Sequence, residues 1–202
     1  MSDALRTPYP GYDVLAKWDS PSWNEQTREV VARRLREVPE RRFLSEDLYA
    51  VLEAVVARLL PQPDRPDDPV PIAPWLDHRL YTDGGDGYRR ETMPPQREAW
   101  PQGLRALDAE SRRRHGAGLC ALDPAQQDDL LRDVQRGAVR GGSWESIPAA
   151  AFFGDVLSAA VGVYYALPAA WSEIGFGGPA SPRGYVRLGA DQRDPWEAEE
   201  HR

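Results

Sequence analysis

Residues 45–61 read SEDLYAVLEAVVARLLP, and they carry the clearest periodic pattern in the chain. Ser45 is a favourable residue for the N-terminal cap of a helix, and Pro61 cannot continue one. Between them the apolar residues recur at intervals of three and four, which indicates a helix with one buried face. These residues are Leu48, Val51, Leu52, Val55, Val56, Leu59 and Leu60. Such a face has to be covered by other elements of the chain.

Further segments show the same periodicity between recognisable start and stop signals. Capping residues such as Ser22 and Asp123, or an early proline, precede them, and a proline or glycine follows them. The predicted helices, with their inward-facing residues, are 22–38 (Val31, Leu35, Val38), 71–81 (Ile72, Trp75, Leu76, Leu80), a helix through Leu104 and Leu107 that ends at Gly116, 123–137 (Leu130, Leu131, Val134), and 149–167 before Pro168 (Phe152, Phe153, Leu157, Val161, Tyr164).

The remaining segments are predicted to be irregular. Residues 61–74 contain six prolines, residues 82–96 suggest an exposed loop, and no alternating pattern is longer than 185–188. The predicted fold class is therefore all-α, a compact helical bundle of about six to seven helices. A length of 202 residues favours one domain. Its parts are an irregular N-terminal extension (1–21), a helical core (22–174) and a Gly/Pro-rich C-terminal arm (175–202).

Composition narrows the possible functions. The formal net charge of −7 opposes binding to nucleic acid. Cys120 is the only cysteine, which excludes an intrachain disulfide and a Cys-x-x-Cys zinc site, and three histidines leave little for a metal site. Seven tryptophans are a high number, and tryptophan often anchors protein interfaces. Composition therefore favours a protein that binds another protein.

The N-terminal residues give an expectation about location. Residues 1–23 lack the basic region and apolar stretch of a secretory signal, so we expect the chain as written in the cytoplasm, or exported together with a partner that carries the signal. The sequence Arg41-Arg42-Phe43-Leu44 is similar to the core of a twin-arginine signal, but acidic residues interrupt the segment after it. We do not interpret it as a signal.

Residues 149–167 have nearly the length of a membrane span. Asp155 and Ser158 lie within them, and no cluster of lysine or arginine flanks them, so the central helix of a bundle is the better interpretation. No transmembrane segment is predicted. A peripheral membrane adaptor that uses this helix is an alternative.

Catalytic residues find little support in the sequence. Neighbouring helical residues point about 100° apart, so Asp77 cannot orient His78 as a general base. Cys120 lies in no nucleophile motif. No catalytic residue is predicted. The alternative function is an independent small helical enzyme that uses Asp155, Glu145 or His78 as acid or base.

Two charged segments also have simple structural interpretations. The acidic loop 83–87 lacks the ligand spacing of a calcium loop. Arg112, Arg113 and Arg114 lie near the predicted end of a helix, where cations are favourable, and are expected on a solvated face. No cofactor-binding or metal-binding residue is predicted in this chain.

The segment 175–185, GFGGPASPRGY, is the most unusual part of the chain. It lacks the glycine spacing of a dinucleotide-binding loop, and its prolines offer no N–H to a phosphate. Glycines, prolines and aromatic residues instead suit an extended arm on a surface, either that of its own bundle or that of another protein. The predicted partner-binding residues are Trp171, Phe176, Gly177, Gly178, Pro179, Pro182, Arg183, Gly184 and Tyr185.

Taken together, these segments resemble the gluconate 2-dehydrogenase subunit 3 family. The resemblance spans about residues 41–188, and it lies in the combination, since each helix alone is generic. The residues that carry it are 45–61, 100–107 with Gly103-Leu104, 126–131 (QQDDLL), Phe152-Phe153, 164–168 (YYALP) leading to Trp171, 175–179 (GFGGP) and 182–185 (PRGY).

The resemblance implies a small helical accessory subunit without catalysis of its own. Such subunits associate with a large flavin-dependent dehydrogenase of the glucose-methanol-choline oxidoreductase type, often alongside a cytochrome c subunit. The large subunit would carry FAD and the chemistry, and the small one would support its maturation, stability or export. Relatives commonly begin with a twin-arginine signal, which this chain as written does not show.

Overall fold

The computed structural model describes residues 7–84, 91–179 and 194–200. Within these ranges it contains seven α-helices and three short 3₁₀ helices and no strand, so the predicted all-α class is confirmed. The fragment 185–188 lies outside the described residues. The chain divides into two compact units, and we name them by position: the terminal unit (Met1–Val38, Pro63–Val70 and Tyr164–Arg202) and the central unit (Pro39–Gln62 and Pro71–Val163). The single domain expected over residues 1–202 stays a prediction.

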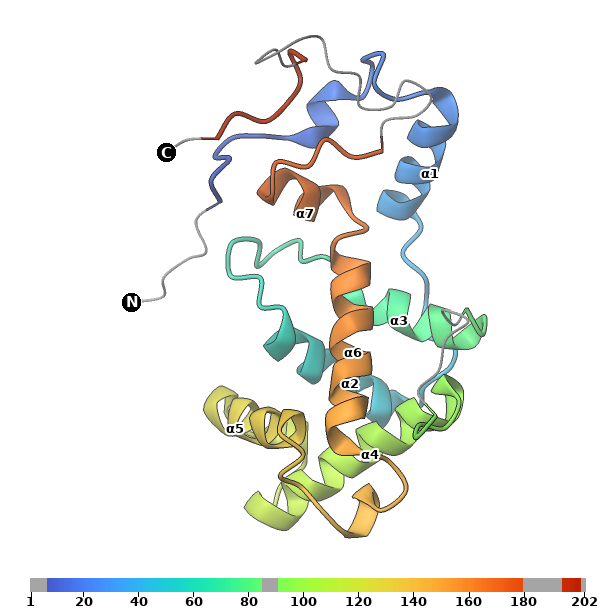
Figure 1. The fold of residues 1–202 in the computed structure, drawn as a ribbon, viewed down its shortest axis with the longest axis vertical. Helices are drawn as coiled ribbons and strands as arrows, with labels where there is room; N and C mark the ends of the chain where they lie inside the picture. Colours follow the sequence, from blue (N-terminus) through green and yellow to red (C-terminus); the bar gives the residue numbers. More distant parts are fainter. Residues whose placement is uncertain (1–6, 85–90, 180–193, 201–202) are drawn as a thin grey trace. The chain divides into compact units, whose positions relative to one another are not determined.

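The central unit is built around α2 (Glu46–Leu59). Helices α3 (Ile72–Tyr81), α4 (Gln96–His115) and α5 (Pro124–Gln135) pack on it, together with the 3₁₀ helix η2 (Leu119–Ala121) (Figure 1). Ser45 is the N-cap residue, as predicted. The predicted face of α2 is buried over Leu48, Val51, Leu52, Val55 and Val56, whereas Leu59 and Leu60 are half-buried.

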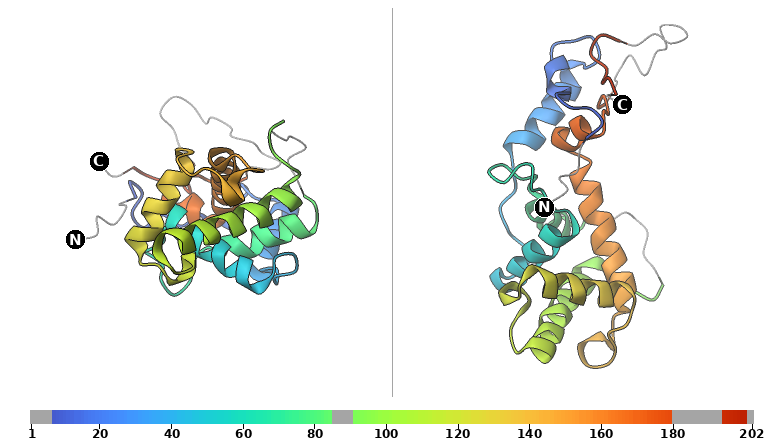
Figure 2. Two further views of the ribbon diagram at one scale, coloured as in Figure 1. Left: turned by 90° about the horizontal axis from the view of Figure 1, so that it is seen from below. Right: turned by 90° about the vertical axis from the view of Figure 1, so that its left-hand side faces the viewer.

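Helix α6 (Ala149–Tyr164) crosses α4 in the central unit (Figure 2). The two helices are in close contact, because a Cβ atom on Gly103 of α4 would lie 2.3 Å from the Phe152 ring. Phe152 and Phe153 are buried, as predicted, while Leu157 and Val161 are half-buried. Among the described residues, none of the helices combines the length and apolar character that crossing a bilayer requires.

The helix predicted over 149–167 is too long. Helix α6 ends at Tyr164, and Pro168 begins a separate helix, α7 (Pro168–Glu173). Proline fixes φ near the helical value. It also lacks a backbone N–H, which costs nothing in the first turn, where the N–H groups have no partner within the helix. The same residue that was expected to stop one helix therefore starts the next.

The terminal unit contains the 3₁₀ helix η1 (Val14–Lys17), α1 (Glu25–Arg36) and α7, and η1 packs on α7. Its core consists of Val14, Trp23, Val31 and Trp171. Residues from both ends of the chain thus share one small core.

Helix α1 begins later than predicted. Its N-cap is Asn24, whose Oδ1 accepts a hydrogen bond from the Thr27 N–H at 2.8 Å. The Ser22 hydroxyl, the predicted cap, instead accepts from Lys17 Nζ. Leu35 and Val38, predicted to face inward, are 44% and 45% exposed.

Two other helix ends agree with their sequence signals. Asp123 and Gln126 form the capping box of α5, and α4 is followed by the C-cap residue Gly116, with the positive φ of 73° that glycine adopts without strain. Two further side chains differ from expectation. Trp75, predicted to face inward, is only half-buried. Met93 lies in the loop predicted to be exposed, yet its flexible apolar side chain is buried in the central unit. Residues 85–90 of that loop lie outside the described residues.

Candidate partner-binding site

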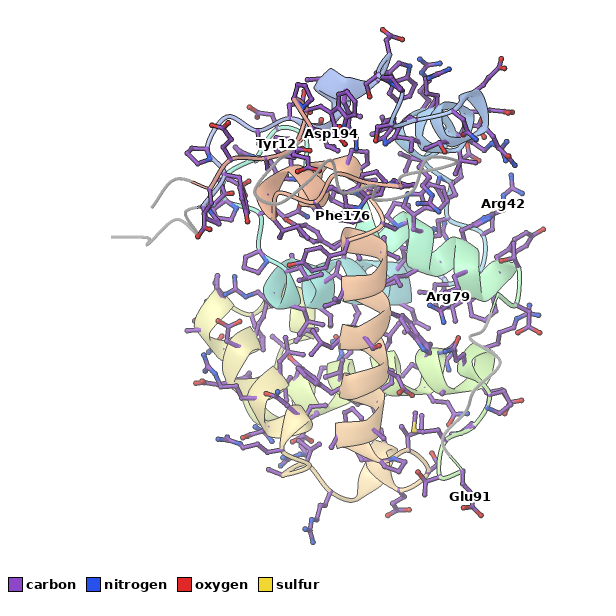
Figure 3. All side chains as sticks on the ribbon, turned by 45° about the horizontal axis from the view of Figure 1, so that its top comes forward. Tyr12, Arg42, Arg79, Glu91, Phe176 and Asp194 are labelled. Atoms are coloured by element: carbon purple, nitrogen blue, oxygen red, sulfur yellow. The ribbon has the colours of Figure 1, made fainter. Side chains whose placement is uncertain are left out.

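The structure describes five of the nine residues predicted to contact a partner. Trp171 lies in α7, and Phe176, Gly177, Gly178 and Pro179 follow this helix in the terminal unit (Figure 3). The remaining four, Pro182, Arg183, Gly184 and Tyr185, lie outside the described residues.

Trp171 lies inside the terminal unit rather than on its surface. The residue is 3% exposed, and its indole N–H donates to the Tyr165 carbonyl oxygen at 2.6 Å. Its ring meets the Trp23 ring edge-on, with 6.5 Å between the centroids. In this structure Trp171 serves the packing of its own chain, and a partner would not reach it without a rearrangement.

Phe176 is exposed but held in place. Its N–H donates to the Trp171 carbonyl oxygen at 2.9 Å. Its ring lies edge-on to the Trp171 ring, with 5.9 Å between the ring centroids. The side chain is nevertheless 40% exposed. An apolar ring presented on a fixed base loses little conformational freedom on binding, so Phe176 has the properties of an interface anchor.

Two glycines let the chain pass close to aromatic rings. Gly175 and Gly178 have φ values of +66° and +71°, and a Cβ atom would lie 2.7 Å from Tyr9 at the first and 3.0 Å from Trp23 at the second. Only glycine fits such close approaches with a positive φ. The described start of the arm therefore covers its own chain, which is one of the two alternatives that composition left open.

A hollow of about 330 Å³ lies beside Phe176. Its lining comes from three parts of the terminal unit: Tyr9, the segment 175–177, and the acidic segment near the C-terminus with Glu197, Ala198 and Glu200. Sequence reasoning missed Tyr9, Glu197 and Glu200 as site residues. No local pattern could have joined them to Phe176, because the chain brings them together only by folding.

Lys17 does not line this hollow but lies next to Gly177, which does. If Gly177 carried a Cβ atom, this atom would lie 3.2 Å from Lys17 Nζ. The Lys17 ammonium donates a hydrogen bond to Ser22 Oγ at 3.1 Å. Burial lowers the pKa of Lys17, and the nearby carboxylates of Glu197 and Asp194 act in the opposite direction.

A second hollow lies in the central unit, between α2, α4 and η2, with a volume of about 860 Å³. Asp47, Arg105, Asp108 and Arg112 contribute charges, and small residues form much of the rest: Ala50, Ala109, Ala117, Gly118 and Ala121. Cys120 also lines it, but partial burial and, secondly, Asp108 raise the pKa of its thiol. The thiol is therefore mostly protonated at neutral pH and is a poor nucleophile.

Asp77 is fully buried and binds backbone rather than His78. Its carboxylate accepts the N–H groups of Arg42 at 2.6 Å and Leu44 at 2.8 Å, as well as that of Phe43. This contact fixes the segment before α2, so the twin-arginine-like motif is part of the folded central unit. The His78 ring lies edge-on to Trp75 at 6.1 Å.

Of the three arginines at the end of α4, Arg112 and Arg113 are exposed, as predicted, whereas Arg114 is half-buried. Arg113 and Arg114 both donate to the carboxylate of Glu110, and Arg114 also donates to the carboxylate of Asp133 in α5. Glu110 is 8% exposed. Its hydrogen bonds to Arg113, opposed by burial and aided by Arg114, lower the pKa of Glu110 to about 2.

Side chains that ligate metals do not gather in the part of the chain that the structure describes. No three His, Cys, Asp or Glu residues of that part come together as metal ligands would. Residues 85–87 of the acidic loop 83–87 lie outside it.

A comparison with protein families identifies the family of this chain. The sequence profile described as gluconate 2-dehydrogenase subunit 3 matches residues 46–178, more than half of the 202 residues. The chain belongs to this family. The resemblance inferred from the sequence segments is thereby confirmed. No curated protein and no solved structure matches the chain.

The match to the gluconate 2-dehydrogenase subunit 3 family runs from the first turn of α2 to Gly178. It includes Phe176 and the glycines on either side of it. It does not include Tyr9, Glu197 or Glu200. The hollow beside Phe176 therefore combines a segment that belongs to the family match with walls from the flanking sequence.

Proposed function

We propose that this chain is a noncatalytic accessory subunit that binds a large FAD-dependent dehydrogenase of the glucose-methanol-choline type and supports its maturation or stability. The family match over residues 46–178 carries this proposal. In the proposed complex, the large subunit binds FAD and acts on gluconate or a related sugar or polyol. This chain contributes no cofactor, and a cytochrome c subunit is a further partner.

The surface of the terminal unit supports a role in binding. Phe176 presents an apolar ring on a base fixed by Trp171, and Tyr165 and Ile174 are also well exposed, at 45% and 47%. Exposed apolar side chains of this size on a small unit favour contact with another protein. We therefore propose this part of the terminal unit as the surface that meets the large subunit.

The central experiment is purification of the chain, tagged at its native level of expression, from its own cells. We expect a large protein to copurify and to release FAD when it is denatured. Recovery of the chain as a lone monomer would contradict the proposal. Fractionation of the same cells would test the predicted location, the cytoplasm or export together with a signal-bearing partner.

One activity measurement and one measurement of FAD loading separate an accessory subunit from an enzyme. The purified chain alone should not oxidise gluconate or other polyols with an artificial electron acceptor, whereas cells that lack the chain should contain less FAD-loaded large subunit. Turnover by the chain alone would instead support the alternative in which Glu145, Asp155 or His78 acts as acid or base.

A further inference from the structure

The hollow beside Phe176 has walls of two chemical kinds. Tyr9 and Phe176 contribute aromatic rings, and Glu197 and Glu200 contribute carboxylates. Its volume of about 330 Å³ lies at the lower end of the range for ligand-binding pockets. Aromatic faces attract cations, and carboxylates form charge-assisted hydrogen bonds with them.

Both aromatic walls are fixed before any ligand arrives. The Tyr9 N–H donates to Thr7 Oγ1 at 3.0 Å, and the Tyr9 ring lies directly against Gly175. Phe176 is held by Trp171 through a backbone hydrogen bond and an edge-on ring contact. The site therefore loses little conformational entropy when it is filled.

Counted over the residues that the structure describes, the charge of the hollow is negative despite Lys17. The two wall carboxylates, Glu197 and Glu200, are exposed, and Asp194 lies in the same acidic segment (Figure 3). The Lys17 ammonium is largely buried, donates to Ser22 Oγ, and lies 5.4 Å from the centroid of the Trp23 ring. Among the described residues, the ammonium of Lys17, which interacts with Glu197 and Asp194, is outnumbered by the carboxylates of Glu197, Glu200 and Asp194, which leaves attraction for a further cation.

We propose that this hollow binds an arginine side chain of the partner protein, with the guanidinium against the rings of Phe176 and Tyr9 and paired with Glu197 and Glu200. Arginine suits it better than lysine, because a guanidinium is planar, stacks on aromatic rings, is weakly hydrated and can pair with carboxylates through two hydrogen bonds. The identity of the partner as a flavoprotein rests on the proposed function. The preference of the hollow for an arginine side chain does not depend on the proposed function.

A direct test uses small probes and the full chain. N-acetyl-arginine amide is titrated into the ¹⁵N-labelled protein, with the lysine and the uncharged citrulline derivatives as comparisons. We expect saturable amide shifts at Gly175, Gly177 and Glu197 with the arginine probe, weaker ones with lysine and none with citrulline. No shift at these amides, or equal saturation by either comparison probe, overturns the proposal.

Matched variants locate the effect. The double substitution E197Q/E200Q should abolish the shifts, while E199Q should leave them, because Glu199 is an exposed carboxylate in the same segment that does not line the hollow. Circular dichroism would confirm that each variant keeps its helices. Equal responses of E197Q/E200Q and E199Q to the arginine probe would refute the site.

The same variants connect the hollow to the complex. With the copurified flavoprotein, E197Q/E200Q should raise Kd about five- to tenfold and E199Q less than about twofold, as expected for exposed charge pairs. If the flavoprotein binds the wild type and E197Q/E200Q equally, the arginine site fails and the proposed function stands. If the wild type recovers no flavoprotein, the proposed function fails, and the small-probe titration still decides on the hollow.

Discussion

At the scale of single residues, Phe176 combines an exposed side chain with a fixed position. Its ring is 40% exposed, yet its backbone and ring are both fixed by Trp171. An exposed apolar ring costs solubility, and a fixed one binds with a small entropic penalty. The combination is expected of a side chain that a partner protein contacts.

We therefore expect Phe176→Ala to weaken binding of the large subunit by about 2 kcal/mol or more, as for an interface hot spot. Its effect on folding should be small because the ring is partly exposed. Titration calorimetry and urea unfolding would measure the two quantities. Tyr81→Ala, which removes a comparably exposed ring from the central unit, is the control. Equal losses of binding in both variants would contradict the role of Phe176.

Glu110 provides a prediction about pH. Its pKa of about 2 in the folded protein lies below the ordinary value of 4.5, so its ionised form stabilises the fold. This stability is complete above pH 4.5 and is lost as the pH falls toward about 2. Because the exposed partner Arg113 is screened by solvent, we expect the ionised Glu110 carboxylate to stabilise the fold by about 1–2 kcal/mol, less than the full pKa difference would give.

Urea unfolding at a series of pH values would measure this contribution. Asp128 and Asp133 also have lowered pKa values, so the wild type alone would mix several carboxylates. The difference in free energy of unfolding between the wild type and Glu110→Gln isolates the contribution of Glu110. This difference should shrink between pH 4.5 and 2. A constant difference across that range would show that Glu110 does not act through its charge.

Residue-scale features could be predicted from the sequence only where their partners are close in the chain. The capping pair Asp123 and Gln126 is three positions apart, and the sequence identifies both. The lining of the hollow beside Phe176 combines Tyr9, Phe176 and Glu197 from three distant segments of the chain. The sequence identifies only Phe176 as a site residue. For the same reason, burial of Trp171 under Trp23 has no local signal.

At the scale of elements, helix existence was more predictable than helix ends. The periodic faces of α2 and α5 identify them because burial of one face dominates their energetics. The break between α6 and α7 was missed, since an apolar sequence continues through it and Pro168 is compatible with both a stop and a start. The exposed Leu35 of α1 shows the converse, a periodic position that no other element covers.

The contact between α4 and α6 gives a prediction at this scale. A Cβ atom on Gly103 would lie 2.3 Å from the Phe152 ring, so Gly103→Ala should destabilise the protein by about 1–3 kcal/mol through overpacking. Gly162→Ala in α6 is a matched control. Nothing lies within 4 Å of its added methyl group, so it should stabilise by up to about 1 kcal/mol, as alanine does in helices.

Thermal and urea unfolding of both variants would test this expectation. Combining Gly103→Ala with Phe152→Leu makes room for the new methyl group and should recover part of the loss. Equal effects of Gly103→Ala and Gly162→Ala would show that α4 and α6 are not in close contact at this point.

At the scale of the whole molecule, the two units differ in their surfaces. Among the described residues, seven large apolar side chains are well exposed, and only Tyr81 belongs to the central unit. The other six are Val30, Leu35, Val38, Tyr165, Ile174 and Phe176. An uneven distribution of this kind favours the terminal unit as the part of the molecule that a partner covers.

Hydroxyl-radical footprinting of the free chain and of its complex with the large subunit would test this distribution. Tyr165 and Tyr81 are the same residue type and are 45% and 46% exposed, so they should be labelled at similar rates in the free chain. In the complex we expect the labelling of Tyr165 and Phe176 to fall several-fold, because a partner on the terminal unit excludes water from them, while Tyr81 stays unchanged. Protection of Tyr81 without protection of Tyr165 would place the interface on the central unit, and the larger hollow between α2 and α4 would then be the better candidate for docking.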